Sequence, residues 1–178
     1  MSKSRDRITY IVTGAIIAAL YVDLTFLSNI FNLAYGQIQF RVSEVLTILP
    51  IFTSAAIPGL TIGCFIANIA SFNPLDMLFG TSATLIAALL TYFLRNIRFK
   101  GIPLLSMFPP VIINAVVIGL ELAFFFLQDV SLLWGFAISA LEVGLGELVI
   151  CVGLGIPFYL AIEKNGLFKR KPGNDDKL

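Results

Sequence analysis

The sequence predicts an all-α integral membrane protein, a six-transmembrane-helix bundle with cytoplasmic N- and C-termini. Of its 178 residues, 58% are hydrophobic and only 13% are charged, and the mean hydropathy is +0.92. A soluble domain of this length cannot bury so much apolar surface, so the expected solvent is the lipid bilayer. Because a spanning helix needs roughly 20 apolar residues, the chain accommodates five or six crossings and no second, soluble domain.

Six apolar segments lie between a short polar N-terminus at residues 1–7 and a charged tail at 163–178. Pro58-Gly59, a pair that commonly breaks helices, separates the second segment from the third. Pro109-Pro110 predicts a kink in the fifth segment. The predicted segments are 8–28, 40–57, 58–71, 74–94, 102–127 and 132–162.

Residues 40–71 hold either one crossing or two. Two crossings would average about 16 residues each, which is short for a ~30 Å core unless the bilayer thins, a re-entrant hairpin forms or the ends are buried in protein. With six crossings, every lysine and arginine except Arg41 faces the cytoplasm, as the positive-inside rule requires. With five, a basic cluster would lie outside. The sequence therefore favours six crossings, in a multi-pass membrane protein.

Arg41 is then the one cation on the outer side, and most of the intramembrane acids fall at the same depth. Ionisable groups in a membrane cost about 2.5–3.5 kcal/mol each on insertion scales, which favours a functional role. For Arg41 and Glu44, a local i,i+3 ion pair is the simpler alternative. Asn114 and Glu121 are seven residues apart and share one helix face. Because the acids outnumber the arginine, the site should hold a neutral or cationic solute rich in hydrogen-bond donors.

Several functional classes lack their motifs in this sequence. There is no histidine and no GxxxxGK[ST], HExxH, GxSxG or CxxC motif, and the net charge of +1 gives no reason to expect a nucleic-acid partner. Cys64 and Cys151 lie far apart in apolar runs and are expected to be packed free thiols. Two alternatives to a solute-binding subunit stay open: a proton-coupled carrier with Glu121 or Glu147 as relay, and a carboxylate-based intramembrane enzyme.

Small residues recur at helical spacing in three segments. In the first, Gly14 and Ala18 overlap with Ala15 and Ala19, and such small-xxx-small pairs let helices approach closely in lipid. The third segment has such a ridge at Gly59, Gly63 and Ala67, and the fourth has one at Gly80, Thr84 and Ala88. Both ridges are expected to pack inside the bundle. The first helix is the better candidate for contact with another protein.

AIIAA at 15–19, in a chain with six predicted spans and about 180 residues, resembles the first helix of the substrate-binding S components of energy-coupling factor transporters. More specifically, the chain resembles the QueT family, S components assigned to queuosine precursors, over about residues 8–162. The segments that carry this resemblance are FRVSEVLTILP, IPGLTIGCFIAN, DMLFGTSATL, PPVIINAVVIGLEL and GELVICVGLG.

The resemblance implies a multi-pass subunit of the bacterial plasma membrane that captures substrate outside, topples in the membrane and releases it inside. A coupling subunit, EcfT, and two cytoplasmic ATPases would supply the power by hydrolysing ATP, with no cofactor or metal in this chain. Ala15 and Ala19 match the AxxxA that contacts the coupling subunit in this class. The implied ligand is 7-aminomethyl-7-deazaguanine or a close relative such as queuine. Its candidate binding residues are Arg41, Glu44, Asn68, Asn114, Glu121, Glu142 and Glu147.

Overall fold

The structure, a computed structural model, describes residues 3–31, 40–69, 74–127 and 130–168. Residues 70–71 of the predicted third segment and 169–178 of the predicted tail lie outside this range. The regular elements of the described chain are all helices, and Phe99 and Ile102 form one isolated β-bridge. Its elements are α1 (Lys3–Ile30), η1 (Val42–Ile51), α2 (Ala56–Ile69), α3 (Pro74–Leu94), η2 (Leu104–Met107), α4 (Phe108–Phe125), α5 (Leu132–Glu147), η3 (Leu148–Leu154) and α6 (Gly155–Asn165).

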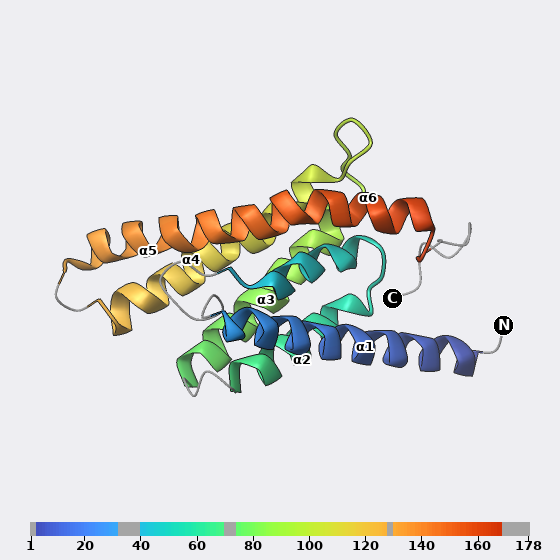
Figure 1. Ribbon diagram of the computed structural model, residues 1–178, viewed down its shortest axis with the longest axis horizontal. Helices are drawn as coiled ribbons and strands as arrows, with labels where there is room; N and C mark the ends of the chain where they lie inside the picture. Colours follow the sequence, from blue (N-terminus) through green and yellow to red (C-terminus); the bar gives the residue numbers. More distant parts are fainter. Residues whose placement is uncertain (1–2, 32–39, 70–73, 128–129, 169–178) are drawn as a thin grey trace.

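The elements form an elongated bundle, in which η2 runs on into α4 and α5 runs on through η3 into α6 (Figure 1). Helix α1 begins at the end of the bundle where α6 finishes, and α4 ends and α5 begins at the opposite end (Figure 1). Helix α2 packs between α1 and α3, and α4 packs between α3 and α5. The loop between α3 and η2 lies at the same end as the start of α1 (Figure 1).

Four helical stretches of the described chain are long and apolar enough to cross a membrane. They are Lys3–Ile30, Pro74–Leu94, Leu104–Phe125 and Leu132–Asn165. Elements η1 and α2 are apolar but shorter. The predicted all-helical membrane architecture is therefore confirmed at the level of four candidate spans and two short apolar helices.

Element η1 is a 3₁₀ helix of ten residues that occupies the middle of the predicted 40–57 segment. At a rise of about 2.0 Å per residue it extends only ~20 Å. Eight of its ten residues are buried among the other helices. Non-α backbone is tolerated at membrane depth where protein rather than lipid surrounds it, so the central position of η1 explains how so short an element fits the bundle.

The structure places the helix break before the position that Pro58-Gly59 indicates. Helix α2 already begins at Ala56, so Pro58 lies in its first turn. Likewise Pro109 and Pro110 do not kink a longer helix but stand at the start of α4, directly after the short 3₁₀ turn η2. Proline is well suited to these positions because the first N–H groups of a helix have no intrahelical partner.

The last span is continuous from Leu132 to Asn165 but contains a π-helical segment, η3. Pro157 lacks an N–H group, so the carbonyl of Gly153 cannot receive an α-helical hydrogen bond from it. A wider π turn just before this proline is a common response and is frequent at functional sites. Here the π segment follows directly on the buried Glu147 and contains the buried Cys151.

Helices α1 and α2 are in backbone contact. A Cβ on Gly59 would lie 2.6 Å from the carbonyl oxygen of Gly14, and one on Gly63 would lie 2.9 Å from that of Ala18. The predicted small-residue packing of the third and fourth segments is confirmed, since their ridges are buried. Ala15 and Ala19, in contrast, point out of the bundle and are exposed.

Candidate functional site

Three buried polar residues from η1 and α2 meet at the start of η1. Arg41 and Glu44 are 8% and 3% exposed, and Asn68 at the end of α2 is fully buried. Nη1 of Arg41 donates to Oδ1 of Asn68 at 3.2 Å. The amide of Asn68 in turn donates to the backbone carbonyl of Asp76 on α3 at 2.9 Å. The arginine is therefore tied to two other helices.

Helix α1 fixes the first residues of η1 through a ladder of three hydrogen bonds. One turn of α1 after another reaches Val42, Ser43 and Glu44 in succession. The three bonded pairs are the Val42 amide to Ser28 Oγ at 2.9 Å, Thr25 Oγ1 to Ser43 Oγ at 2.8 Å, and the Tyr21 hydroxyl to Glu44 Oε1. We call these pairs the α1–η1 ladder. Glu44 thus has a strong partner on α1, so its role is not limited to a local pair with Arg41.

A second polar cluster joins α4 to the last span. Nδ2 of Asn114 donates to Oε1 of Glu147 at 2.7 Å, and the thiol of Cys151 donates to Oε2 of the same carboxylate at 3.1 Å. The Cys151 sulfur also lies 3.6 Å from the backbone carbonyl oxygen of Glu44. This contact brings the second cluster against η1.

Glu121 is the least satisfied acid in the described part of the chain. Its side chain is 2% exposed, and neither carboxylate oxygen has a hydrogen-bond partner among the described residues. It shares the buried face of α4 with Asn114, as their spacing predicts. The carboxylates of Glu121 and Asp76 are near enough to interact electrostatically. Glu121 also lines an apolar groove of about 640 Å³ between α3 and α4.

Electrostatic interactions extend from Arg41 to the buried acids of both clusters. The arginine attracts the carboxylates of Glu44, Glu121 and Glu147 electrostatically. The carboxylates of Glu147 and Glu44 repel each other. Among the lysine, arginine, aspartate and glutamate residues of the described chain, the buried ones are this one arginine and these three glutamates. Oε2 of Glu44, like both oxygens of Glu121, has no hydrogen-bond partner among the described residues. Buried carboxylates without partners are costly, so these three oxygens are suited to accept hydrogen bonds.

Hydrogen bonds join Arg41 to Asn68 and Asn114 to Glu147, and the second pair reaches the backbone of Glu44 through Cys151. Glu121 lies on the same buried face of α4 as Asn114 but has no hydrogen bond to any of these residues. Glu142 is half-buried on α5, and no hydrogen bond among the described residues joins it to the others. Sequence reasoning missed Tyr21 and the rest of the ladder. The available signal was the spacing on α1, because Gly14, Ala18, Tyr21 and Thr25 recur every three to four residues and form its buried stripe.

Cys64 and Cys151 are buried free thiols, as the sequence predicts. Both lie at the polar clusters rather than in purely apolar packing. The sulfur of Cys64 accepts from Thr84 Oγ1 at 3.2 Å and lies 3.4 Å from Asn68 Nδ2. Each thiol thus helps to position a residue of the candidate site.

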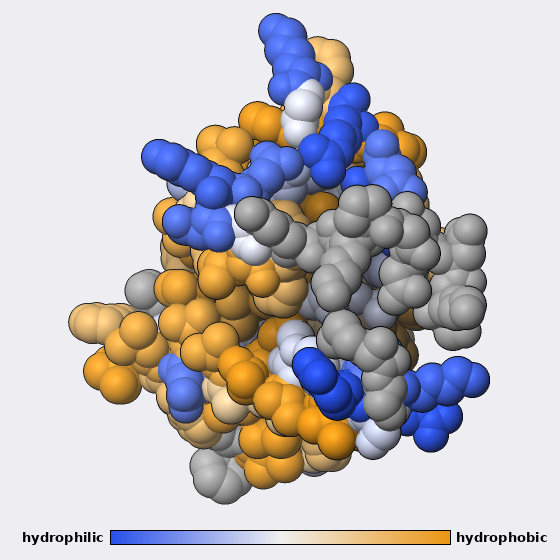
Figure 2. Space-filling model, turned by 90° about the vertical axis from the view of Figure 1, so that its right-hand side faces the viewer, coloured by the Kyte–Doolittle hydropathy of each residue, from blue (hydrophilic) through white to orange (hydrophobic). Residues whose placement is uncertain are grey.

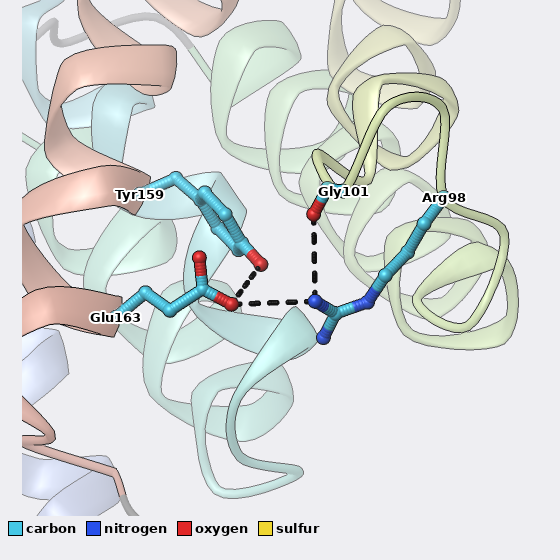
Figure 3. Close-up of polar contacts among 4 residues, drawn as sticks. All are labelled: Arg98, Gly101, Tyr159 and Glu163. Carbon is cyan, nitrogen blue, oxygen red and sulfur yellow. Dashed lines mark hydrogen bonds and ion pairs between the residues drawn. The ribbon is translucent and has the colours of Figure 1, made fainter.

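The opposite end of the bundle carries a separate, exposed polar cluster. Arg98 and Glu163 form an ion pair at 3.2 Å with side chains 50% and 46% exposed. The Tyr159 hydroxyl donates to the same Glu163 oxygen at 2.9 Å (Figure 3). Hydrophilic side chains gather over this end of the molecule (Figure 2). Because this pair is solvated, its contribution to stability is small.

An apolar groove of about 620 Å³ runs between α1 and α2 on the outside of the bundle. Ala15 and Ala19 line one wall, and Pro58 and Ile62 line the other. The groove also has large, exposed apolar side chains in its lining, such as Ile66, which is 44% exposed. The same helix therefore presents the ladder to the interior and this groove to the surroundings.

Comparison with known proteins supplies an independent view of the chain. A family described as "QueT transporter" matches residues 11–164. The "Queuosine precursor transporter QueT" of Lactococcus lactis subsp. cremoris is 46% identical over 101 residues. That alignment covers 56% of this chain and 57% of the relative, so it spans little more than half of each. No solved structure matches the chain.

Proposed function

The chain belongs to the QueT transporter family, and on that premise we propose that it is the substrate-binding S component of an energy-coupling factor importer. It captures a queuosine precursor, 7-aminomethyl-7-deazaguanine or a relative such as queuine, at the outer face of the plasma membrane. The observation that carries this proposal is the imbalance of the buried site, in which one arginine faces three acids and three carboxylate oxygens lack hydrogen-bond partners among the described residues.

The chemistry of the proposed ligand complements this imbalance. An aminomethyl group is a cation at neutral pH, and a guanine-like ring adds several N–H donors. Glu44 and Glu121 accept these donors with their unpartnered oxygens, because charge-assisted hydrogen bonds are the strong ones. Asn68, Asn114 and Arg41 complete the recognition of the ring edge. Glu147, whose oxygens already accept from Asn114 and Cys151, orients the second cluster.

The topology of the proposal has six crossings, with η1 and α2 as the two short ones and both termini in the cytoplasm. The described basic residues of α1, of the loop after α3 and of the end of α6 support it, because these three regions lie at one end of the bundle (Figure 1) and the positive-inside rule assigns that end to the cytoplasm. The candidate site then lies in the outer half. EcfT docks on the α1–α2 groove through Ala15 and Ala19, and two ATPases hydrolyse the ATP.

Exchanging Glu121 for glutamine tests the site directly. Glu121→Gln keeps the shape of the side chain but removes the negative charge, so we expect the dissociation constant of 7-aminomethyl-7-deazaguanine to rise at least about tenfold. Isothermal titration calorimetry on detergent-purified protein measures it. Glu163→Gln is the matched control, because Glu163 lies in the exposed cluster at the other end of the bundle. The Glu163→Gln variant should bind the deazapurine with the affinity of the wild type. Equal affinities in all three proteins would remove Glu121 from the site.

The function itself is tested by binding and by uptake. Purified wild-type chain should bind one molecule of the deazapurine, which mass spectrometry of the extracted ligand identifies. Proteoliposomes should accumulate labelled ligand only when EcfT and both ATPases are present with ATP. Uptake driven by a pH gradient without ATPases would favour the proton-coupled carrier, and a covalently altered product would favour the intramembrane enzyme. Absence of binding would overturn the S-component proposal.

A further inference from the structure

The α1–η1 ladder ends on the one residue of η1 that offers a free buried carboxylate oxygen. Glu44 uses Oε1 to accept from the Tyr21 hydroxyl, while Oε2 has no hydrogen-bond partner among the described residues. A carboxylate held through one oxygen has its second oxygen fixed in direction. The geometry therefore makes Tyr21 the group that sets where the open oxygen of Glu44 points.

Tyr21 is itself rigidly held. Its side chain is fully buried, and α2 passes so close that a Cβ on Gly63 would lie 2.8 Å from the Cβ of Tyr21. One turn further along α1, Thr25 bonds to Ser43 and also returns a hydrogen bond to the carbonyl of Tyr21. The tyrosine is clamped between α2 and η1, so its hydroxyl has a defined position.

We propose that Tyr21 is a positioning residue for substrate binding, acting through Glu44 rather than by touching the ligand. This inference rests on the proposed function and adds to it a residue on a helix that contributes no group to the predicted ligand contacts. It also gives α1 two faces with separate roles. Its outward face carries Ala15 and Ala19, and its inward face holds the acid that receives the ligand.

Replacing Tyr21 by phenylalanine removes the hydroxyl and little else. We expect Tyr21→Phe to weaken binding of 7-aminomethyl-7-deazaguanine at least about tenfold, because a hydrogen bond to a charged group is lost. Tyr159→Phe is a closely matched control. Tyr159 is also fully buried and also donates to a glutamate, but at the opposite end of the bundle. Removing the Tyr159 hydroxyl should leave the affinity for the deazapurine within threefold of the wild type.

A double-mutant cycle separates positioning from general destabilisation. If Tyr21 acts through Glu44, then adding Tyr21→Phe to Glu44→Gln should cost less than threefold, whereas a structural role would cost the same in both backgrounds. Measuring the ligand-dependent rise in melting temperature at up to millimolar ligand keeps hundredfold losses of affinity measurable. If Glu44→Gln binds no ligand even at millimolar concentration, the affinities of Tyr21→Phe and Tyr159→Phe decide whether Tyr21 contributes to binding.

The outcomes are distinct. Wild-type affinity in Tyr21→Phe, or an undiminished loss in the Glu44→Gln background, would overturn the positioning role while leaving the S-component proposal intact. A wild-type chain that binds no deazapurine would instead overturn the proposed function. Melting temperatures of Tyr21→Phe and Tyr159→Phe, measured without ligand, should agree within a few degrees. A much lower value for Tyr21→Phe alone, with affinity restored at low temperature, would assign Tyr21 a purely structural role.

Discussion

Gly59→Leu should prevent the chain from reaching a stable, monodisperse fold. A Cβ at this position would lie 2.6 Å from the carbonyl oxygen of Gly14 and 3.2 Å from its Cα. The obstacle is backbone, so no side-chain rotation relieves it. Overpacking by single methylenes already costs about 1–3 kcal/mol in well-packed cores, and leucine adds four carbons here. Fluorescence-detected size-exclusion chromatography and thermal unfolding in detergent should show aggregation or a melting temperature lower by many degrees.

Gly153→Leu provides the matched control for this prediction. Gly153 is also helical, but it is exposed and a Cβ there would meet no atom within 4 Å. The same substitution should therefore leave the elution profile and the melting temperature near those of the wild type. If Gly59→Leu were as stable as Gly153→Leu, the backbone contact between α1 and α2 would not exist as described. The ladder on α1 would then lose its support as well.

The prediction at Gly59 depends on close helix packing, which the spacing of small residues in the sequence does indicate. Small-xxx-small spacing identifies a helix that can approach another closely, and the apolar runs identify where helices lie. The fourth predicted segment, 74–94, coincides with α3. In a membrane chain the hydropathy signal is strong because each span must be apolar over most of its length. Helix positions are therefore the part of the fold that sequence patterns predict best.

Hydropathy says much less about elements that protein surrounds on all sides. Element η1 is buried around most of its circumference, so it has no lipid-facing stripe whose period would distinguish a 3₁₀ helix from an α-helix. Pro50, inside η1, was a hint of irregular geometry. The π segment before Pro157 could not be predicted for a similar reason, because it lies inside one uninterrupted apolar run.

Some polar residues of the candidate site could be predicted from hydropathy, and others could not. Charged and amide side chains stand out in apolar runs, and for this reason the sequence predicts Arg41, Glu44 and Asn114 as site residues. Tyr21 is not predicted, since a tyrosine in an apolar helix is unremarkable on hydropathy alone. Its importance comes from its partner on another element, and a sequence without coordinates does not show which helices meet.

Leucine at both Ala15 and Ala19 should abolish uptake while leaving ligand binding unchanged. Both alanines are exposed and line the groove between α1 and α2. Larger side chains would fill that groove and keep a partner helix from close approach, whereas leucine facing lipid does not disturb the bundle. Uptake by proteoliposomes with EcfT and ATPases should fall to background, and calorimetric affinity for the deazapurine should stay within threefold of the wild type.

The matched control for the alanine pair lies on the same helix. Ile16→Leu and Leu20→Ile change exposed apolar residues next to the groove without changing their bulk, and uptake should persist. This comparison separates docking from binding, because the outward face of α1 is altered while Tyr21 and its bond to Glu44 remain. Loss of affinity together with uptake would instead mean that the two faces of α1 do not act separately. Full uptake by the double leucine variant would move the docking surface away from Ala15 and Ala19.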